Sequence, residues 1–263
     1  VYGDTGDLQA VTAERAAYPD GLDKKSLGLK RARVESYQGL IFATWNEDGP
    51  SLPDYLGDAT WYLDMVFGMT ESGMKVAGPP QRWIVNSNWK LAADNFSADG
   101  YHAASTHRSI GEIGVMPPEL LGVDALYGVN VTDPETGHGM RCISLGSPDG
   151  GMSVEDSCQM FGLPADAADE VAARFTAEQL NVLGNHPPGV GNVFPNLGWL
   201  NAPLANVIDG PFEPMCSIRL WHPISPGKFE VWNWALVQRD ATPEMQAIAR
   251  RSVIRTFGSS GIF

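Results

Sequence analysis

Apolar and polar positions alternate in two short runs near the start of the chain. Arg33–Tyr37 and Leu40–Trp45 flank Gly39 in the pattern of a β-hairpin. Gly-Asp-Thr-Gly at 3–6 is a further turn signal. Residues 1–50 are therefore expected to be rich in β-structure.

A helical spacing begins near residue 51. Pro53 suits a first helical turn. Gly78-Pro-Pro80 then interrupts the chain, residues 82–85 predict a short strand, and residues 90–98, without Pro or Gly, predict a helix. The apolar stripe of the first helical stretch consists of Tyr55, Leu56, Trp61, Tyr62, Met65 and Val66.

The second half of the chain mixes loops, strands and helices. Residues 108–163 are rich in Gly, Pro and Asp and predict loops, with short strands near 125–131 and 140–145. The Ala- and Glu-rich stretch 165–183 predicts one helix that stops at Gly184. Two strands, 215–222 and 228–237, flank a Pro-Gly turn, and Thr242-Pro243 predicts the start of a helix that runs to Phe257.

Composition narrows the class of protein. The chain has 263 residues, of which 43% are hydrophobic and 19% charged, as in soluble globular proteins with a core. No apolar run reaches the roughly 18 residues of a membrane helix. The start resembles no signal peptide and lacks a Met, so the chain is expected to be the middle of a longer one. A net charge of −13 argues against nucleic-acid partners, which need cations against phosphates.

Cysteine usage indicates the compartment. Cys142, Cys158 and Cys216 are odd in number, widely spaced and form no C-x-x-C. They predict buried structural thiols in a reducing, cytoplasmic setting.

Four polar residues lie in or just after the predicted helix 90–98. On a continuous helix, Asn95, Asp99 and His102 would share one face. His102 and His107 are five residues apart, roughly 140° on an ideal helix, so a local distortion near Gly100, or a helix end before His107, is needed to bring them together. Imidazole is a common metal ligand, but two histidines hydrogen-bonded in a polar pocket would fit this spacing equally well.

A wider motif surrounds these residues. Asn88-Trp89-Lys90, Asp94-Asn95-Phe96 and Asp99-x-x-His102-x-x-x-x-His107 resemble the mononuclear-iron motif of Rieske non-heme iron aromatic ring-hydroxylating dioxygenases, large (alpha) subunit. The resemblance implies that His102 and His107 bind Fe(II). It also implies that Asp99 hydrogen-bonds His102 and links the iron to the Rieske cluster of a neighbouring subunit, and that Asn95 lies close to the iron.

The resemblance carries a fold and a domain plan. It implies an α+β helix-grip fold (Bet v1/START-like), with a long antiparallel sheet, helices packed on one side and the pocket between them. Residues 1–50 are expected to be the C-terminal part of a Rieske [2Fe-2S] domain without its cluster ligands, since no Cys precedes 142. Residues 51–263 are expected to be the mononuclear-iron catalytic domain, truncated at its C-terminus. The carboxylate of a 2-His-1-carboxylate triad would lie beyond Phe263, so this piece alone is expected to be inactive.

The implied reaction is the addition of O2 to an aromatic hydrocarbon, giving a cis-dihydrodiol at Fe(II). The implied partners are further alpha subunits in a trimer, commonly beta subunits, and a ferredoxin and reductase as electron donors. Residues 192–200 resemble a family strand that lines the substrate pocket. His186 matches a pocket histidine if a short insertion is allowed, and a structural loop histidine is equally compatible. The other pocket-wall candidates are Phe96, Ala103, Ile110, Leu200, Phe257 and Phe263.

Two other functions remain compatible with the residues. A zinc hydrolase could use His102, His107 and Asp99, and a non-catalytic binding module could have the same cavity without a metal. Metal content together with O2 dependence separates the first from a dioxygenase. Ligand binding that survives His102→Ala would favour the second.

Overall fold

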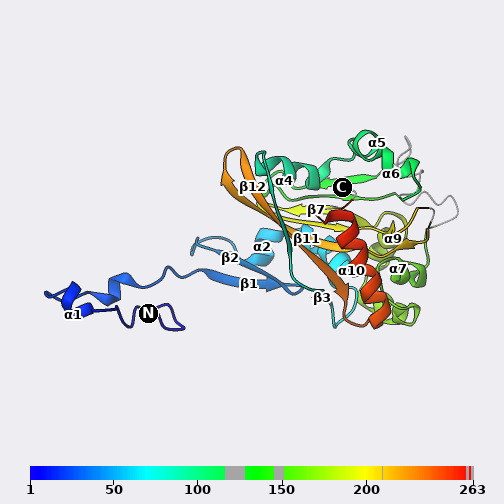
Figure 1. Ribbon diagram of the computed structural model, residues 1–263. Helices are drawn as coiled ribbons and strands as arrows, with labels where there is room; N and C mark the ends of the chain where they lie inside the picture. Colours follow the sequence, from blue (N-terminus) through cyan, green and yellow to red (C-terminus); the bar gives the residue numbers. More distant parts are fainter. Residues whose placement is uncertain (116–127, 145–150, 209, 259–260, 262–263) are drawn as a thin grey trace. The chain divides into compact units, whose positions relative to one another are not determined.

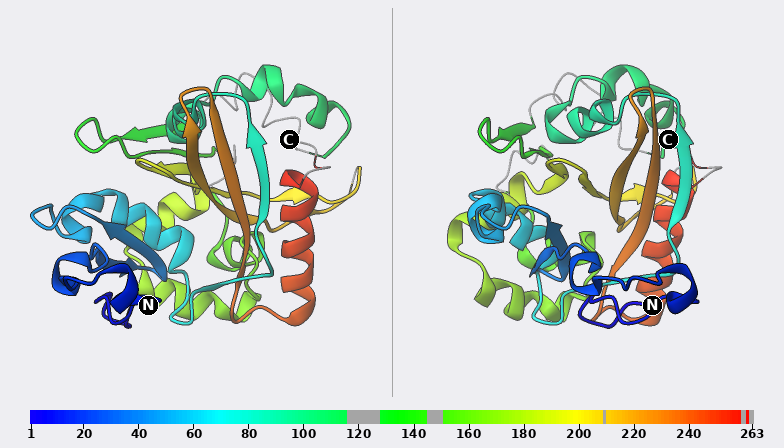
Figure 2. Two further views of the ribbon diagram at one scale, coloured as in Figure 1. Left: turned by 60° about the vertical axis from the view of Figure 1, so that its left-hand side comes forward. Right: turned by 90° about the vertical axis from the view of Figure 1, so that its left-hand side faces the viewer.

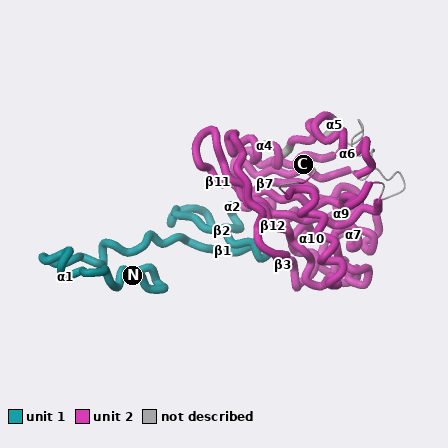
Figure 3. Tube along the Cα trace, viewed as in Figure 1, with its two compact units in different colours: residues 1–55 teal, residues 56–263 magenta. Residues whose placement is uncertain are grey.

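The structure is a computed structural model, and it describes residues 1–115, 128–144, 151–208, 210–258 and 261 (Figure 1). The chain divides into two compact units, Val1–Tyr55 and Leu56–Phe263 (Figure 3). Each is described by itself below. Helix α2 (Leu52–Leu56) lies at the division.

Unit 1 contains the predicted hairpin. β1 (Arg33–Tyr37) pairs antiparallel with β2 (Leu40–Thr44). Gln38 and Gly39 form the two-residue turn, with φ of 48° and 78°, the left-handed conformation that matches the twist of the two strands. Before the hairpin, β-structure in the described residues is limited to an isolated antiparallel bridge between Tyr2 and Leu8, so the expected β-structure of residues 1–50 lies mainly in β1 and β2. The described elements there are the short helices α1 (Glu14–Ala17) and η1 (Lys24–Leu27), and Glu-Arg-Ala-Ala is a run of good helix formers.

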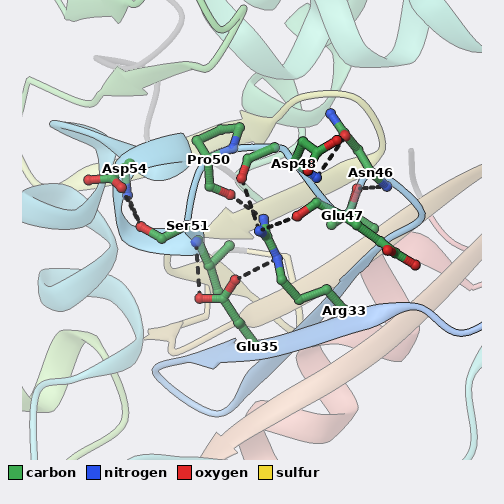
Figure 4. A network of polar contacts seen from close by, with 11 residues as sticks. Arg33, Glu35, Asn46, Glu47, Asp48, Pro50, Ser51 and Asp54 are labelled. Atoms are coloured by element: carbon green, nitrogen blue, oxygen red, sulfur yellow. Dashed lines mark hydrogen bonds and ion pairs between the residues drawn. The ribbon is translucent and has the colours of Figure 1, made fainter.

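Arg33 connects the hairpin to the segment that follows it (Figure 4). Its guanidinium donates to the carbonyl oxygens of Gly49, at 2.9 Å, and of Pro50. Its Nε lies 3.3 Å from a carboxylate oxygen of Glu35, whose other oxygen accepts the backbone N–H of Leu52 at 3.1 Å. Hydrogen bonds from these two side chains of β1 to the backbone therefore hold the start of α2.

Unit 2 contains an eight-stranded antiparallel sheet. The order is β3-β12-β11-β8-β7-β6-β5, and β4 also pairs with β12. The predicted strands 82–85, 215–222 and 228–237 are confirmed as β4, β11 and β12. The bounds of the eight strands are β3 Met74–Val76, β4 Gln81–Val85, β5 Val129–Thr132, β6 Gly139–Cys142, β7 Pro188–Val193, β8 Leu197–Asn201, β11 Cys216–Ser225 and β12 Lys228–Gln238. β9 (Leu204–Ala205) and β10 (Phe212–Glu213) form a separate pair.

Helices cover both faces of the sheet, which corrects the expectation of helices on one side. Gly198 and Trp199 are adjacent in β8 and so face opposite sides. The ring of Trp199 lies 6.2 Å from that of Phe67 in α3 (Ala59–Phe67), measured between centroids. A Cβ added at Gly198 would instead lie 2.6 Å from Trp221 and 3.0 Å from Phe96 in α4 (Trp89–Ala98). The α+β class with an antiparallel sheet is confirmed.

The helix predicted to run from Thr242-Pro243 to Phe257 is confirmed as α10 (Pro243–Phe257). The Thr242 hydroxyl caps it by accepting the N–H of Met245. The helix runs alongside the long β11–β12 hairpin in both views of Figure 2. The remaining helices are α5 Ala103–Thr106, α6 Arg108–Glu112, α7 Val154–Met160, η4 Ala165–Ala167, α8 Ala168–Arg174 and α9 Ala177–Asn185.

Three elements differ from the sequence predictions. The single helix 165–183 is instead η4, α8 and α9, because Thr176 and Gln179 form a reciprocal capping box that begins a new helix. Residues 192–200 are not one strand: β7 and β8 meet at a turn that contains the cis Phe194–Pro195 bond. The predicted loop region 108–163 also contains the helices α6 and α7. Residues 125–127 of the strand predicted near 125–131 lie outside the described part.

The three cysteines are unpaired and buried, as predicted. Burial raises the pKa of Cys142 and Cys158 to about 11 and that of Cys216 to about 12, so all three are protonated thiols at neutral pH. None of the described helices has the length and apolar character needed to span a bilayer.

Candidate metal centre

Helix α4 is fixed at its N-terminus by Asn88. The side-chain oxygen of Asn88 accepts the N–H of Lys90 at 2.9 Å, which caps the helix. Its amide nitrogen donates to the carbonyl of Pro226, at 2.8 Å, in the β11–β12 turn. On the inner side of α4, the rings of Phe96 and Trp221 pack edge to face with centroids 5.1 Å apart. These contacts hold the helix against the sheet.

The helix ends at Ala98, before the residues of interest. Asp99 is extended, and its Oδ1 accepts the backbone N–H of Tyr101 at 3.0 Å and of His102 at 3.4 Å. A carboxylate that caps two successive N–H groups in this way stabilises a turn. A Cβ at Gly100 would lie 2.3 Å from Cζ of Arg141 in β6, so a larger residue there would require the guanidinium or the turn to move. The break in the helix is thus built into the sequence.

This break brings four side chains together. His102 Nδ1 lies 3.1 Å from Asp99 Oδ2, and Asn95 Nδ2 lies 3.3 Å from His102 Nδ1 and 3.4 Å from Asp99 Oδ2. The Nε2 atoms of His102 and His107 are 3.0 Å apart. Asn95, Asp99 and His102 therefore meet, but not on one continuous helix face. His102 precedes α5, and His107 lies between α5 and α6.

The electrostatics favour a neutral His107 and an ionised Asp99. Burial, together with the charge of His102, lowers the pKa of His107 to about 4. Burial alone would raise the pKa of Asp99, but the backbone N–H of His102, its charge and the N–H of Tyr101 outweigh this, and the net shift is downward. At neutral pH the carboxylate can accept His102 Nδ1–H, which leaves the Nε2 lone pair facing His107.

The spacing of the two nitrogens suits a metal with ligands at right angles. Two imidazole bonds of about 2.1 Å at about 90° place their nitrogens about 3.0 Å apart, whereas a tetrahedral angle gives about 3.4 Å. The observed separation is 3.0 Å. Within the described residues, no group of three or more His, Cys, Asp or Glu side chains converges on a metal position. The described chain thus brings two imidazole nitrogens together, and their 3.0 Å separation is also that of a direct hydrogen bond between the rings.

The pocket-wall candidates lie in several elements. Phe96 and Ile110 are buried in α4 and α6, Phe257 is buried at the end of α10, and Leu200 in β8 packs against the clusters around both Phe96 and Phe257. His186 follows α9, and its Nδ1 is buried without a partner in the described structure. The side chain of Ala103 and all of Phe263 lie outside the described residues.

The sequence interpretation missed Arg219. It lies in β11, is 6% exposed, and its Cζ lies 3.5 Å from the ring centroid of Phe257 and 4.9 Å from that of Phe96. The sequence did contain a sign of this residue. An arginine stands at an inward-facing position of the predicted strand 215–222, where an apolar side chain would be expected.

Residues 52–260 match the family model described as "Ring hydroxylating alpha subunit (catalytic domain)". The chain belongs to this family of ring-hydroxylating alpha subunits. The match covers the whole of the candidate centre. Iron at a mononuclear site and a Rieske cluster are implied by the family, and the His102–His107 pair fits such a site in donor type and spacing.

Relatives in the ring-hydroxylating family include three that align over nearly all of this chain. The N,N-dimethyl phenylurea N-demethylase subunit alpha of Sphingobium sp. (strain YBL2) is 36% identical over 270 aligned positions, covering 100% of this chain and 57% of that protein. The large oxygenase component of the naphthalene 1,2-dioxygenase system of Pseudomonas aeruginosa is 34% identical, covering 100% and 56%. The crystal structure of naphthalene 1,2-dioxygenase from Rhodococcus sp. bound to indole has a TM-score of 0.79 at 37% identity, covering 99% and 57%. The chain thus spans little more than half the length of these relatives.

Proposed function

We propose that the protein to which this chain belongs is the alpha subunit of an aromatic ring-hydroxylating dioxygenase, which adds O2 to an aromatic hydrocarbon to give a cis-dihydrodiol. The observation that supports this most is the pair of Nε2 atoms 3.0 Å apart, with Nδ1 of His102 against Asp99. The similarity to naphthalene 1,2-dioxygenases supports the choice of substrate class.

Each polar residue of the centre has a role in this proposal. His102 and His107 would hold Fe(II) through Nε2, together with a carboxylate that the described residues do not supply. Ferrous iron held in this way supplies the activation of O2. Asp99 accepts Nδ1–H of His102, which fixes the tautomer and ring orientation, and it passes electrons from the Rieske cluster of a neighbouring subunit. Asn95 donates to Asp99 and keeps the carboxylate facing the ring.

The partners follow from the same role. Asp99 is 38% exposed and Tyr101 is 79% exposed, as needed for a contact with a neighbouring alpha subunit in a trimer. We assign residues 1–50 to the C-terminal part of a Rieske [2Fe-2S] domain and residues 51–263 to the catalytic domain. Beta subunits, a ferredoxin and a reductase complete the system. The three buried, unpaired thiols agree with a cytoplasmic setting.

A second reaction is favoured by one relative. The Sphingobium protein is named as an N-demethylase of N,N-dimethyl phenylurea, and it is 36% identical to this chain. Oxidative removal of an N-methyl group needs the same O2-activating centre and differs in the substrate carbon that faces it. Comparing naphthalene with an N,N-dimethyl phenylurea as substrates decides between the two. The comparisons give no support to a zinc hydrolase or a non-catalytic binding module.

The experiment uses the full-length protein with a reductase and ferredoxin. With 18O2 and naphthalene, both oxygens of the diol should come from O2, and iron should be the bound metal. His102→Ala and His107→Ala should each remove iron and product, while His222→Ala, outside the centre, should keep both. Zinc in place of iron with O2-independent hydrolysis, or aromatic binding untouched by His102→Ala in a metal-free protein, would contradict the proposal.

A further inference from the structure

A row of polar residues crosses the sheet beneath α4 and α10. In register, Asn192 (β7) pairs with Gly198 (β8), Gly198 with Arg219 (β11), Arg219 with Asn233 (β12), and Asn233 with Gln81 (β4). Directly opposed residues of paired strands share a face, and Gly198 places this face beneath α4. Asn192 and Asn233 are each 1% exposed. A buried polar row of this kind is not what a simple core needs.

Arg219, in the centre of this row, is a buried charge that has no counter-charge among the described residues. Its Nε donates to Oδ1 of Asn233 at 3.2 Å, and Asn233 in turn donates to Oε1 of Gln81 at 3.2 Å. Nη2 of Arg219 has no partner, and no carboxylate pairs with Arg219 anywhere in the described ranges. Burial lowers its pKa to about 9, which still leaves it protonated at neutral pH. Burying such a charge costs free energy, so its presence calls for a reason other than stability.

The guanidinium contacts aromatic rings from two helices at once. Its Cζ lies 3.5 Å from the ring centroid of Phe257, the last residue of α10. It lies 4.9 Å from the ring centroid of Phe96, which directly follows Asn95 in α4. A planar guanidinium stacks on aromatic faces and attracts their π-electrons, an effect that strengthens when water is excluded. One side chain thus contacts two rings, one of them on the helix that carries Asn95.

We propose that Arg219 is a specificity-determining positioning residue: it holds Phe96 and Phe257 in fixed relation to each other and so sets which bond of an aromatic substrate faces the metal. This rests on the proposed function and on these two rings being pocket walls. Arg219 acts through the rings and does not touch the reacting atoms. Lysine at this position would keep the charge but lose the flat stacking surface, and methionine would keep similar length without charge or hydrogen bonds.

The test compares products from phenanthrene, which offers several chemically distinct bonds for dihydroxylation. In the full-length enzyme, Arg219→Met should change the ratio of diol regioisomers by at least about threefold, as expected for the loss of one desolvated cation–π contact. Arg219→Lys should change it in the same direction by less. Arg82→Met is the matched control: Arg82 lies 4.3 Å from the ring of Trp232 but is half exposed and paired with Glu230, and its loss should leave the ratio unchanged.

Two further measurements separate positioning from a structural role. If Arg219 acts by positioning the rings, Arg219→Met should change the ratio while the protein keeps a cooperative melting transition and the parent's iron content. In a Phe257→Ala background, Arg219→Met should change the ratio less than it does in the parent, since only the longer contact with Phe96 remains. An unchanged ratio in folded Arg219→Met, or the same change from Arg82→Met, would overturn the inference. If Arg219→Met does not fold, an unchanged ratio in Arg219→Lys would do so.

The outcomes for the proposed function are distinct. A parent enzyme that oxidises no aromatic compound counts against the dioxygenase, whatever the Arg219 variants do. In that case, phenanthrene fluorescence with the metal-free protein decides the role of Arg219. The emission and affinity of bound phenanthrene should differ between the parent and Arg219→Met but not between the parent and Arg82→Met. Identical binding in all three proteins would overturn the positioning role.

Discussion

Oδ2 of Asp99 lies 3.1 Å from Nδ1 of His102, while Nε2 of the same ring faces His107 at 3.0 Å. The two nitrogens of one imidazole therefore serve different partners. A carboxylate on Nδ1–H keeps the other nitrogen deprotonated and directed at a metal position. Asp99 thus lies on the side of the His102 ring opposite to His107, the position that the proposed supporting role requires.

Replacing Asp99 by Asn tests this placement. The amide keeps the shape and removes the charge, so iron should largely remain, since both imidazoles are intact, while turnover should nearly vanish because electrons no longer reach the iron. Reduced Rieske cluster should persist with O2 and substrate present. If Asp99→Asn loses iron and activity together, Asp99 is a metal ligand. If its iron content and turnover both stay near normal, Asp99 is only a surface carboxylate. Iron analysis and cluster reoxidation on one variant decide the matter.

The stability of the metal-free protein should fall with acid because of His107. Its pKa is about 4 in the fold, below the ordinary 6.5. Above pH 6.5 the ring is neutral in both folded and unfolded chains, and its contribution is complete. As the pH falls from 6.5 to 4, only the unfolded chain takes up the proton, so stability is lost. Urea unfolding between pH 6.5 and 4 should show that the free energy of unfolding falls less steeply with acid in His107→Gln than in the parent. An equal slope in the two proteins would contradict the lowered pKa of His107. His222→Gln serves as a control.

Gly100→Ala should disturb the centre without touching a ligand. The new Cβ would lie 2.3 Å from Cζ of Arg141, so the guanidinium or the turn that carries Asp99 must move. We expect lower iron content and turnover, and a smaller loss when Arg141→Ala is also present. Gly227→Ala is the control, because nothing lies within 4 Å of the added atom. Equal effects at both glycines would argue against a tight turn at residue 100.

The start of α9 provides a test of the fold alone. Thr176→Ala removes the hydroxyl that caps Gln179 N at 3.2 Å and should cost about 1 kcal/mol of unfolding free energy. That corresponds to a fall of about 2–4 °C in melting temperature for a domain of this size. Thr176→Ser keeps the hydroxyl and should stay near the parent. Calorimetry on the three proteins would reveal whether α8 and α9 are independently capped helices.

The sequence predicted those elements whose signals are local. The β1–β2 hairpin follows from alternation around Gly39, and α10 follows from Thr242 and Pro243. It did not predict the division at Thr176, because helix propensity alone makes 165–183 look continuous and the capping box competes with it only by side-chain geometry.

The candidate centre shows the same limit. The motif singled out four residues whose side chains the structure brings together, and Gly100 was expected to allow a local irregularity. The actual arrangement depends on a turn that lies against Arg141 in a distant strand, which the sequence did not reveal. Arg219 was missed for a related reason. Its position beneath two helices depends on strand register across β8, β11 and β12, which no short-range pattern encodes.

Because Asp99, His102 and His107 lie within nine consecutive residues, bringing them together closes only very short loops. The loop-closure entropy of this half of the centre is therefore small, and it can form while most of the sheet is still being assembled. The fit of Gly100 against Arg141 in β6 must instead wait for the long-range pairing of the strands. The local part of the candidate centre and its fit against the sheet are thus separated in folding time.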